Sequence, residues 1–588
     1  MTNVDLQLAE APADPITRVD IRGLQTSCWV VLIVIAIVRA WLTRYFIHGD
    51  AISYLDLGRM IAEGHSGSAI HAYWSPGYPI LLSLFLRVFH PDAYWESPLA
   101  HFVNVVVFIG ALACFQLFWR ELRQWHENYA KRCGTEISER AFWILGYSAY
   151  AIAALNVIGV ALVCPDLLVA ALCCLAGWAA LRFRRSPSTG RALVLGLVLA
   201  LGYYAKSPFF PMGFVFIVCA GLGWPPPRRT ILLGGTALAT YLLMCAPYIA
   251  AISLSKGHFT FGESARLAQA FYINGVQHYQ HWQGGPPGSG IPVHPTRKLN
   301  DFPAIYEFAA MDMETYPPWF DPTYWYQGVT PHPNWKLQAK IFVANLLLEF
   351  QIIMEFCAML VAAVIVLALL TGYRRRWMKG FWDLWYIWAP AAIALPMFAL
   401  VHVESRFLGG WLILLFAGAI CACPQPAGGS TGRVVSCVAF AAVLTATASL
   451  ASQASQEALG RDHTTDRSQS SAVIAKFLLN NGLHPGEQVA VIGDGADGAY
   501  WAHLARLRVV SEIPASYWPP EAHPSFDFWE SGPERQQRSL RILEQTGAKA
   551  VVAGSQTSMP GMVPSVVPSS WKKIDGTWAY VYFFHANP

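Results

Sequence analysis

The sequence is poor in charged residues. Only 13% of its 588 residues are Asp, Glu, Lys or Arg, and 54% are hydrophobic. A soluble domain carries about 25% charged residues. The formal net charge is only +4, which gives no support for nucleic-acid binding. The composition therefore excludes an ordinary soluble enzyme and indicates that most of the chain lies in a lipid bilayer.

Cysteine is missing from every long polar stretch, namely 45–97, 256–340 and 454–588. Structural disulfides in those stretches are therefore excluded. The twelve cysteines lie in apolar runs or short basic loops and show no zinc-like spacing. A basic leader region is missing too, because residues 1–20 are polar and acidic. We therefore expect the first apolar segment to be a retained membrane span rather than a cleaved signal peptide.

Apolar runs, by contrast, are abundant. Crossing about 30 Å of hydrocarbon takes roughly 20 residues in a helix, and eleven segments approach or exceed that length. They are 24–44, 97–118, 142–163, 167–181, 191–206, 208–224, 230–254, 341–370, 381–401, 406–422 and 433–453. A shorter apolar helix at 76–90 is expected to lie in the membrane interface. The predicted fold is a mainly α, polytopic transmembrane protein.

The connections between these spans alternate in charge. Basic side chains gather in 119–141, in 182–191, at 228–229 and in 374–379, whereas the intervening connections have almost none. Cytoplasmic loops of membrane proteins carry an excess of Lys and Arg. We therefore place the N-terminus in the cytoplasm and the long loops 45–97 and 256–340 outside. The eleventh span then leaves the C-terminal region outside as well.

Three parts follow from this topology: a cytoplasmic tail (1–23), a transmembrane domain (24–453) and an extracytoplasmic domain (454–588). In the last part, short runs typical of strands alternate with helical ones, which favours a small α/β domain. The expected strands are 488–493, 508–513 and 549–553, with a helix at 535–546 and a closing hairpin in 571–584. Loop 256–340 is much longer than a usual connection and rich in aromatics, which indicates an ordered, functional loop.

The unusual polar residues near the spans all fall in connections that this topology places outside. In chain order they are Asp50, Asp166, Lys206, His402, Glu404 and Arg406. Each one alone is as well explained by a loop-end charge or a snorkelling side chain as by a functional role. Ionisable groups at a bilayer are costly, however, and usually serve function or pairing. Carboxylates and cations together on one membrane face favour an active site.

The chemistry that suits such a site is transfer from a lipid-linked sugar. Sugar nucleotides are cytoplasmic, so the donor for an external site has to arrive through the membrane, as a polyprenyl-phosphate sugar does. Lys206 and Arg406 would bind the departing phosphate, and Asp50 would take the proton of the attacking hydroxyl. The other candidates for substrate binding are Tyr54, Trp74, Tyr78, His402 and Glu404.

At these residues the chain resembles the GT-C type of membrane glycosyltransferase, in particular the bacterial relatives of protein O-mannosyltransferases and lipid A aminoarabinose transferases. The resemblance covers about residues 1–420 in architecture but only short motifs in sequence. The motifs are Gly49-Asp50 with Tyr54, Ser75-Pro-Gly-Tyr-Pro79, Cys164-Pro-Asp166-Leu-Leu, Tyr204-Ala-Lys206-Ser-Pro208 and Glu404-Ser-Arg406-Phe407. It implies an inverting hexosyl- or pentosyltransferase of the bacterial inner membrane, with Asp50 as base and Asp166 as its partner.

The chain departs from this family at one position. Many members carry Glu directly after the first Asp, where this chain has Ala51. A divalent metal such as Mg²⁺ or Mn²⁺ prefers several oxygen ligands. Asp50 and Asp166 would supply two of them and the donor phosphate a third. The sequence thus leaves metal dependence open and favours a reaction that does not require a metal.

Other interpretations compete with a glycosyltransferase. A transporter or flippase of a lipid-linked glycan is the main alternative, although its ionisable groups would lie near mid-membrane in repeated halves. A scaffold that presents the C-terminal region is the third. That region also spells G-x-G-x-x-G at 493–498, but Asp494 and Asp497 would repel a pyrophosphate, which favours a tight turn over a nucleotide site. The expected partners are the donor, membrane lipid and a glycan, lipid or protein acceptor, without nucleic acid.

Overall fold

The computed structural model describes most of the chain between residues 21 and 584. The described ranges are 21–133, 139–222, 228–276, 281–308, 314–370, 374–422, 463–515, 524–554 and 567–584, with a few single residues between 441 and 455. The predicted N-terminal tail (1–23) and the eleventh predicted span (433–453) lie almost wholly outside these ranges.

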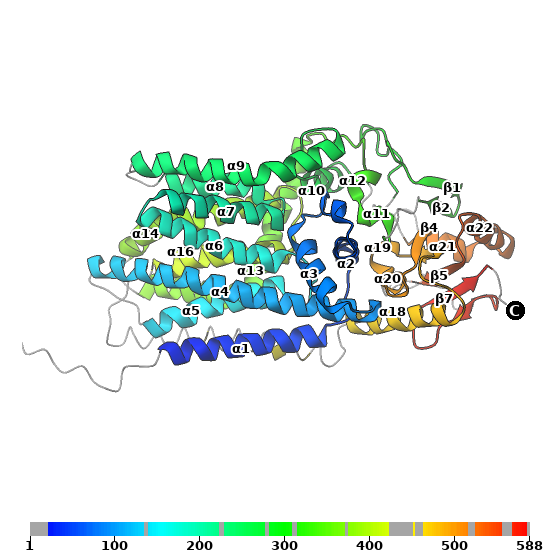
Figure 1. The fold of residues 1–588 in the computed structure, drawn as a ribbon, viewed down its shortest axis with the longest axis horizontal. Coiled ribbons are helices and arrows are strands. Elements are labelled where there is room, and N and C mark those ends of the chain that lie inside the picture. The colour runs from blue at the N-terminus through cyan, green and yellow to red at the C-terminus, as the bar shows by residue number, and fades with distance from the viewer. Residues whose placement is uncertain are drawn as a thin grey trace, which may run out of the picture.

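A bundle of apolar helices forms one end of an elongated molecule, and a small sheet forms the other (Figure 1). The bundle consists of α1 (Ile21–Leu42), α4 (Ala93–Cys133), α5 (Glu139–Ala151), α6 (Asp166–Arg185), α7 (Thr189–Ala205), α8 (Phe209–Gly221), α9 (Arg228–Lys256), α13 (Trp335–Leu370), α14 (Arg374–Asp383), α15 (Trp385–Ala399) and α16 (Ser405–Cys421). Each predicted span up to 406–422 coincides with one of these helices. Within the described residues, six helices are long and apolar enough to cross a membrane. The expected polytopic helical architecture is thereby confirmed.

The third predicted span, 142–163, ends earlier than expected. α5 continues as a π-helical turn over Ile152–Ile158, and Gly159 then ends it with φ at 83°. A residue with a side chain rarely adopts this left-handed conformation, whereas glycine does so at little cost. The chain therefore leaves the helix here and runs in an irregular path to the start of α6.

Small residues allow the helices of the bundle to pack closely. A Cβ added at Gly146 of α5 would lie only 2.2 Å from the indole of Trp119 on α4. Likewise, one added at Gly177 of α6 would lie 2.7 Å from the ring of Phe118. Membrane helices associate through such close contacts, because lipid offers little hydrophobic driving force between them.

Short helices cover the end of the bundle that faces the sheet. They are α2 (Gly49–Ala62), α3 (Gly77–Phe89), α10 (Ser264–Ala268), α11 (Pro317–Phe320) and α12 (Pro322–Trp325). The predicted apolar helix at 76–90 is α3. Its exposed Ile80, Leu84 and Val88 are spaced by four residues on one face, as in a helix that lies in the membrane interface.

The sheet has seven strands in the order β1-β2-β4-β3-β5-β7-β6. Its strands are β1 (Arg297–Asp301), β2 (Ala304–Glu307), β3 (Gln488–Gly493), β4 (Arg508–Pro514), β5 (Ala550–Gly554), β6 (Lys572–Lys573) and β7 (Tyr580–Phe583). β3 pairs in parallel with β4 and β5, and the outer pairs are antiparallel. The predicted small α/β domain is thus present. Two of its strands, β1 and β2, come from the loop 256–340, which the sequence analysis did not foresee.

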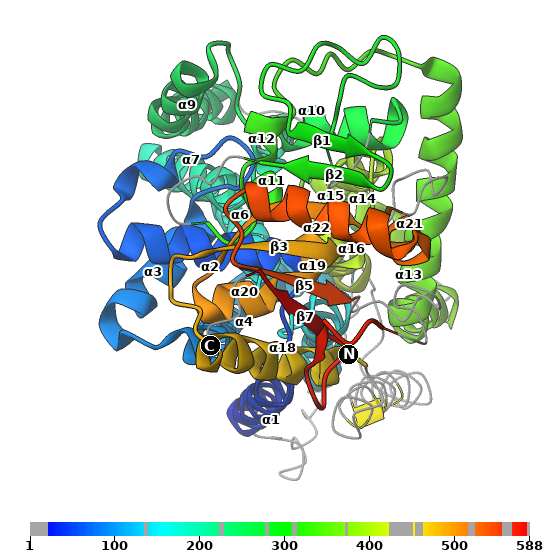
Figure 2. The same ribbon diagram turned by 90° about the vertical axis from the view of Figure 1, so that its right-hand side faces the viewer.

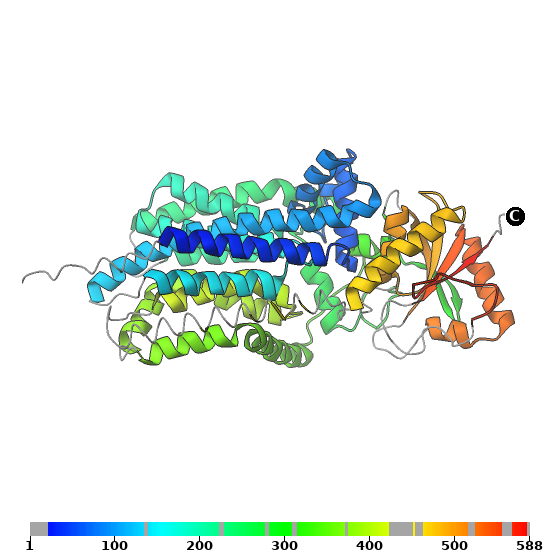
Figure 3. The ribbon, with the colours of Figure 1, turned by 90° about the horizontal axis from the view of Figure 1, so that it is seen from below.

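Helices cover both faces of the sheet (Figures 2 and 3). One face packs on α21 (Pro524–Glu530) and α22 (Pro533–Gln545), the other on α18 (His463–Asn480) and α20 (Tyr500–Ala505). Alternate residues of a strand point to opposite faces, so Ile492 joins the first of these two layers and Val491 the second. The second layer shares one hydrophobic core with the helical bundle. The sheet and the bundle are therefore packed together rather than only joined by a linker.

Candidate active site

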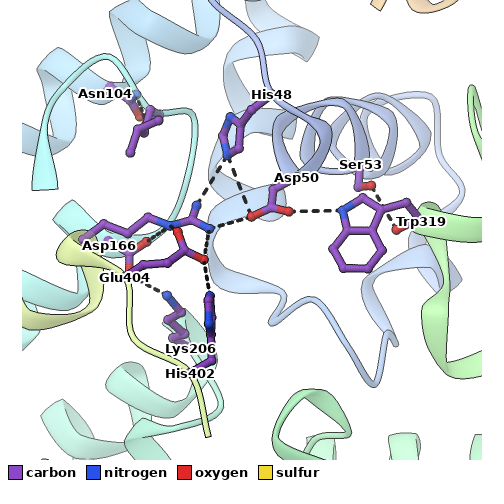
Figure 4. A network of polar contacts seen from close by, with 11 residues as sticks. His48, Asp50, Ser53, Asn104, Asp166, Lys206, Trp319, His402 and Glu404 are labelled. Carbon is purple, nitrogen blue, oxygen red and sulfur yellow. Dashed lines mark hydrogen bonds and ion pairs between the residues drawn. The ribbon is translucent and has the colours of Figure 1, made fainter. Parts of the chain in front are cut away.

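The sequence-predicted polar residues meet where helix ends converge at the sheet-facing end of the bundle (Figure 4). Asp50 lies in the first turn of α2, and Asp166 is the first residue of α6. The N-terminus of a helix carries partial positive charge and favours a carboxylate. Lys206 directly follows α7, and Arg406 lies in the first turn of α16. Four separate elements thus bring two carboxylates and two cationic side chains to one place.

Arg406 is the centre of this arrangement. Its Nη2 lies 2.8 Å from Asp50 Oδ2, and its Nε lies 2.7 Å from Glu404 Oε2. The same Nε is 3.9 Å from Asp166 Oδ2. A guanidinium group offers five N–H donors in a fixed plane, which suits it to several oxygen acceptors at once. With only 10% of its side chain exposed, Arg406 holds three carboxylates around one cation.

Lys206 supplies the second cation. Its Nζ donates to Asp166 Oδ1 at 2.6 Å and lies 3.9 Å from the ring centre of Phe407. The side chain of Lys206 is 22% exposed, whereas that of Asp166 is 2% exposed. An ammonium group has three donors, so Lys206 can still bind an oxygen of a ligand while it holds Asp166.

Asp50 is ionised despite its burial. Burial alone would raise the pKa of this carboxyl, but the charges of Arg406 and His48 outweigh that effect and hold the pKa below its usual value. The pKa of Glu404 is lowered as well: burial opposes the shift, and His402 and Arg406 overcome it. With Asp166, the site then carries three carboxylates against two permanent cations.

Aromatic side chains form a wall beside Asp50. Trp319 of α11 donates its indole N–H to Asp50 Oδ1 at 3.1 Å, and its carbonyl accepts from Ser53 Oγ at 3.2 Å. Its ring lies 5.8 Å from that of Trp74 and 5.5 Å from that of Tyr73. The long loop 256–340 therefore reaches the catalytic candidate directly, through a residue that the sequence analysis did not single out.

Trp74 and Tyr78, two of the residues predicted to bind substrate, pack within this wall. The rings of Trp74 and Tyr78 both lie edge-on against Tyr54, at 5.0 and 5.4 Å. Tyr78 is fully buried and donates to Asn104 Oδ1 at 2.6 Å. The amide nitrogen of Asn104 donates in turn to the carbonyls of residues 160 and 162. This chain of bonds holds the irregular segment that leads to Asp166.

His402 and Glu404 form a further pair beside Arg406. His402 Nε2 is 3.3 Å from Glu404 Oε1, and its ring stacks on Tyr272 with centroids 4.3 Å apart. Both side chains lie beside Arg406, the phosphate-binding candidate. His48, Trp319 and Asn104 were not predicted. His48 stands only two residues before Asp50 in the sequence, a signal that could have found it, whereas nothing local marks the other two.

The two aspartates do not fit a metal ion as they stand. Arg406 contacts one oxygen of Asp50 and one of Asp166, Lys206 holds the other oxygen of Asp166, and Trp319 donates to the other oxygen of Asp50. A divalent cation between them would lie against the guanidinium group and be repelled. Over the described residues, no group of three His, Cys, Asp or Glu side chains is placed to hold a metal ion.

Comparison with known proteins gives a likeness in structure only. No protein-family model matches the sequence, and no curated protein is significantly similar to it. Two solved structures of ArnT from Cupriavidus metallidurans match at 13% identity. The apo form covers 95% of this chain and 98% of its own, with a TM-score of 0.49. The form bound to undecaprenyl phosphate covers 94% and 97%, with a TM-score of 0.50. The match at a TM-score of 0.50 confirms the expected GT-C fold, and it shows the fold alone.

Proposed function

We propose that the protein is a membrane glycosyltransferase. It moves a sugar from a polyprenyl-phosphate donor to a hydroxyl group of a cell-envelope acceptor, at the external face of the bacterial inner membrane and with inversion. The observation that carries the proposal is the single network that joins Asp50, Asp166, Lys206, Glu404 and Arg406. The GT-C fold, and the undecaprenyl phosphate bound by the similar ArnT structure, support a donor of this class.

The charges suit the reaction. A sugar linked through phosphate to a polyprenol carries one negative charge, and the departing polyprenyl phosphate carries up to two. Cations placed where charge develops stabilise the transition state more than the bound donor. Lys206 and Arg406 are therefore assigned to the phosphate. Both residues lie at the ends of apolar helices, which is where a lipid phosphate would meet a helix that spans the bilayer.

Asp50 is assigned to the acceptor. As the acceptor oxygen attacks the anomeric carbon, its proton passes to a carboxylate oxygen of Asp50. The bond from that carbon to the phosphate oxygen breaks, and its electron pair leaves with the phosphate. Attack from the face opposite the departing phosphate inverts the configuration. The lowered pKa of Asp50 keeps it ionised at neutral pH, so that it can accept the proton when the hydroxyl becomes acidic in the transition state.

Donor binding and activation of the base are linked by Arg406. Its Nη2 is hydrogen-bonded to Asp50 and its Nε to Glu404. A phosphate close to this guanidinium competes with both carboxylates for the same donors. Weakening the ion pair raises the pKa of Asp50, which makes it a stronger base only when the donor is present.

The experiment that tests the proposal is turnover in proteoliposomes with synthetic polyprenyl-phosphate sugars and an envelope-lipid extract. We expect a new glycosylated product and release of polyprenyl phosphate, identified by mass spectrometry. We expect the same rate with EDTA present. Movement of donor lipid across the bilayer with no covalent product would contradict the proposal and favour a flippase.

Trp319→Phe tests the aromatic wall. The substitution keeps a ring beside Trp74 but removes the hydrogen bond to Asp50. The indole fixes the direction of the Asp50 carboxylate, and misplacing a reacting group slows the step even when it stays ionised, so we expect kcat to fall roughly tenfold. The pKa of Asp50 rises when a donor is lost, so the acid limb of the pH–kcat profile moves to higher pH.

The matched control for this substitution is Trp325→Phe. Trp325 belongs to the same loop, but its indole donates to the carbonyl of Pro317 at 2.9 Å rather than to Asp50. An unshifted acid limb in this variant, beside a shifted one in Trp319→Phe, assigns the effect to the carboxylate contact. Equal profiles in both variants would contradict it.

A further inference from the structure

A completely buried histidine joins the C-terminal region to the helical bundle. His503 of α20 has no exposed side-chain surface. Its Nδ1 lies 2.9 Å from Asp56 Oδ1, and its Nε2 lies 2.8 Å from Glu96 Oε2. A neutral imidazole donates from one nitrogen only, whereas ionised carboxylates only accept. Both contacts are hydrogen bonds when His503 is the doubly protonated cation, so it bridges α2 and α4 as an imidazolium.

The first of these partners lies on the helix that carries the proposed base. Asp50 stands in the first turn of α2, and Asp56 lies less than two turns further along the same helix. Asp56 also accepts from the backbone N–H of Thr315 at 2.8 Å and from its hydroxyl at 3.1 Å. The buried carboxylate of Asp56 therefore connects α2 to the C-terminal region and to the part of loop 256–340 that leads to Trp319.

A second route connects the sheet to the same loop. The backbone N–H of Val509 on β4 donates to the Thr315 carbonyl at 3.1 Å. The Tyr316 hydroxyl donates to Glu512, also on β4, at 2.9 Å. Three residues further on, Trp319 donates to Asp50. The C-terminal region thus holds both structures that set the direction of the Asp50 carboxylate: its own helix and its indole partner.

We propose that the C-terminal α/β region orients the catalytic carboxylate, and that His503 is the positioning residue through which it holds α2. The inference rests on the proposed function for the role of Asp50. The shared hydrophobic core of the bundle and the α18–α20 layer supports it, because it fixes the region that carries His503. Productive geometry needs the reacting groups held within a fraction of an ångström.

The charge of His503 makes this connection sensitive to pH. Burial disfavours the imidazolium, but the hydrogen bonds and charges of Asp56 and Glu96 outweigh it and raise the pKa of His503 to about 9, from an ordinary 6.5. The other charged or titratable groups at this place are Arg59, Tyr500 and Arg506. A raised histidine pKa contributes stability fully below the ordinary value, and that contribution is lost as pH rises through about 9. The connection therefore holds at neutral pH and weakens in alkali.

The test is His503→Gln in the full-length protein, reconstituted in lipid nanodiscs and followed by amide hydrogen exchange and by turnover. We expect exchange in peptides 49–62 and 315–320 to rise about tenfold. We expect kcat to fall by a similar factor, on the order of 10, while the donor KM changes less than about twofold. The control is His484→Gln, an exposed histidine of the same region, which is expected to change neither quantity.

A measurement on the wild type keeps the inference testable if His503→Gln does not fold, and a double substitution extends the test if it does. In the wild type, protection of peptide 49–62 is expected to fall between pH 8 and 10, after correction for the intrinsic exchange rate, around the pKa of about 9. If the variant does fold, we combine it with Asp56→Asn. The double variant is expected to raise exchange in α2 and to lower kcat by less than the two single changes together, compared as free energies, because the two groups form one pair. Unchanged protection of α2 across that pH range, or strict additivity, would overturn the inference.

These outcomes are separable from failure of the proposed function. If the wild type transfers no sugar but α2 exchanges faster in His503→Gln, the glycosyltransferase assignment is wrong. The contact between the C-terminal region and α2 is then still supported. If the wild type transfers sugar, and His503→Gln has the same kcat and the same protection of α2, the glycosyltransferase assignment stands. The positioning role of His503 is then wrong.

Discussion

Asp50→Asn is expected to leave a folded, membrane-inserted protein that transfers sugar at least about 10²-fold more slowly, since general-base catalysis typically contributes 10²–10⁴-fold. The amide has almost the same shape as the carboxylate and can still accept from Trp319, but it cannot take a proton at neutral pH. Arg406 keeps its contact with Glu404, so the site does not lose all compensation for that cation. The measurement is kcat with a saturating polyprenyl-phosphate sugar.

The control for Asp50→Asn is the same substitution at Asp301, a fully solvated aspartate on β1 with 92% of its side chain exposed. It is expected to transfer sugar at the wild-type rate. Retention of full activity by Asp50→Asn would remove Asp50 as the base. Asp50→Glu separates chemistry from position, because it keeps a carboxylate but moves it by one methylene. We expect partial activity from that variant.

The apolar runs were sufficient to predict the bundle because each membrane span is a local property of the sequence. A helix in lipid satisfies its own backbone hydrogen bonds, so its presence can be predicted from about 20 consecutive apolar residues. The predicted site followed from the same spans. Asp50, Asp166, Lys206 and Arg406 lie at helix ends, and the order of spans places all four at one end of the bundle.

The remaining parts depend on contacts between distant residues, which periodicity does not encode. Trp319 meets Asp50 across 269 positions of sequence, and His503 meets Asp56 across 447. The strands β1 and β2 are short runs within an aromatic-rich loop, and their place in the sheet depends on pairing with β4. Asn104 lies within an apolar helix and gains its role only from the irregular backbone after Gly159. Each of these features is created by tertiary packing.

Arg406→Gln is expected to have an effect as large as that of Asp50→Asn, for a different reason. Removing one partner of a buried ion pair leaves uncompensated charge and costs about 3–5 kcal/mol. Here the carboxylates of Asp50, Glu404 and Asp166 would face one another with only Lys206 to balance them. The departing phosphate would also lose its planar, multidentate partner. We therefore expect kcat to fall at least about 10²-fold and the donor KM to rise.

The pH dependence separates these contributions. Arg406 is the main charge that lowers the pKa of Asp50, so its removal raises that pKa. A lowered carboxyl pKa contributes stability that is present at neutral pH and is lost as pH falls; Arg406→Gln should therefore be less stable than the wild type at pH 7 and nearly equal to it in acid. The residual activity should show its acid limb at higher pH.

Arg406→Lys decides whether charge alone is sufficient. A lysine keeps the positive charge but presents a single ammonium, which cannot span Asp50 and Glu404 as the guanidinium does. We expect activity between that of the wild type and that of Arg406→Gln, with the donor KM closer to the wild type. Arg87→Gln, at an exposed arginine of α3 near the same end of the bundle, is the control and should be silent. Equal activity of Arg406→Gln and the wild type would show that the donor phosphate binds elsewhere, and the site proposed for this protein would then be wrong.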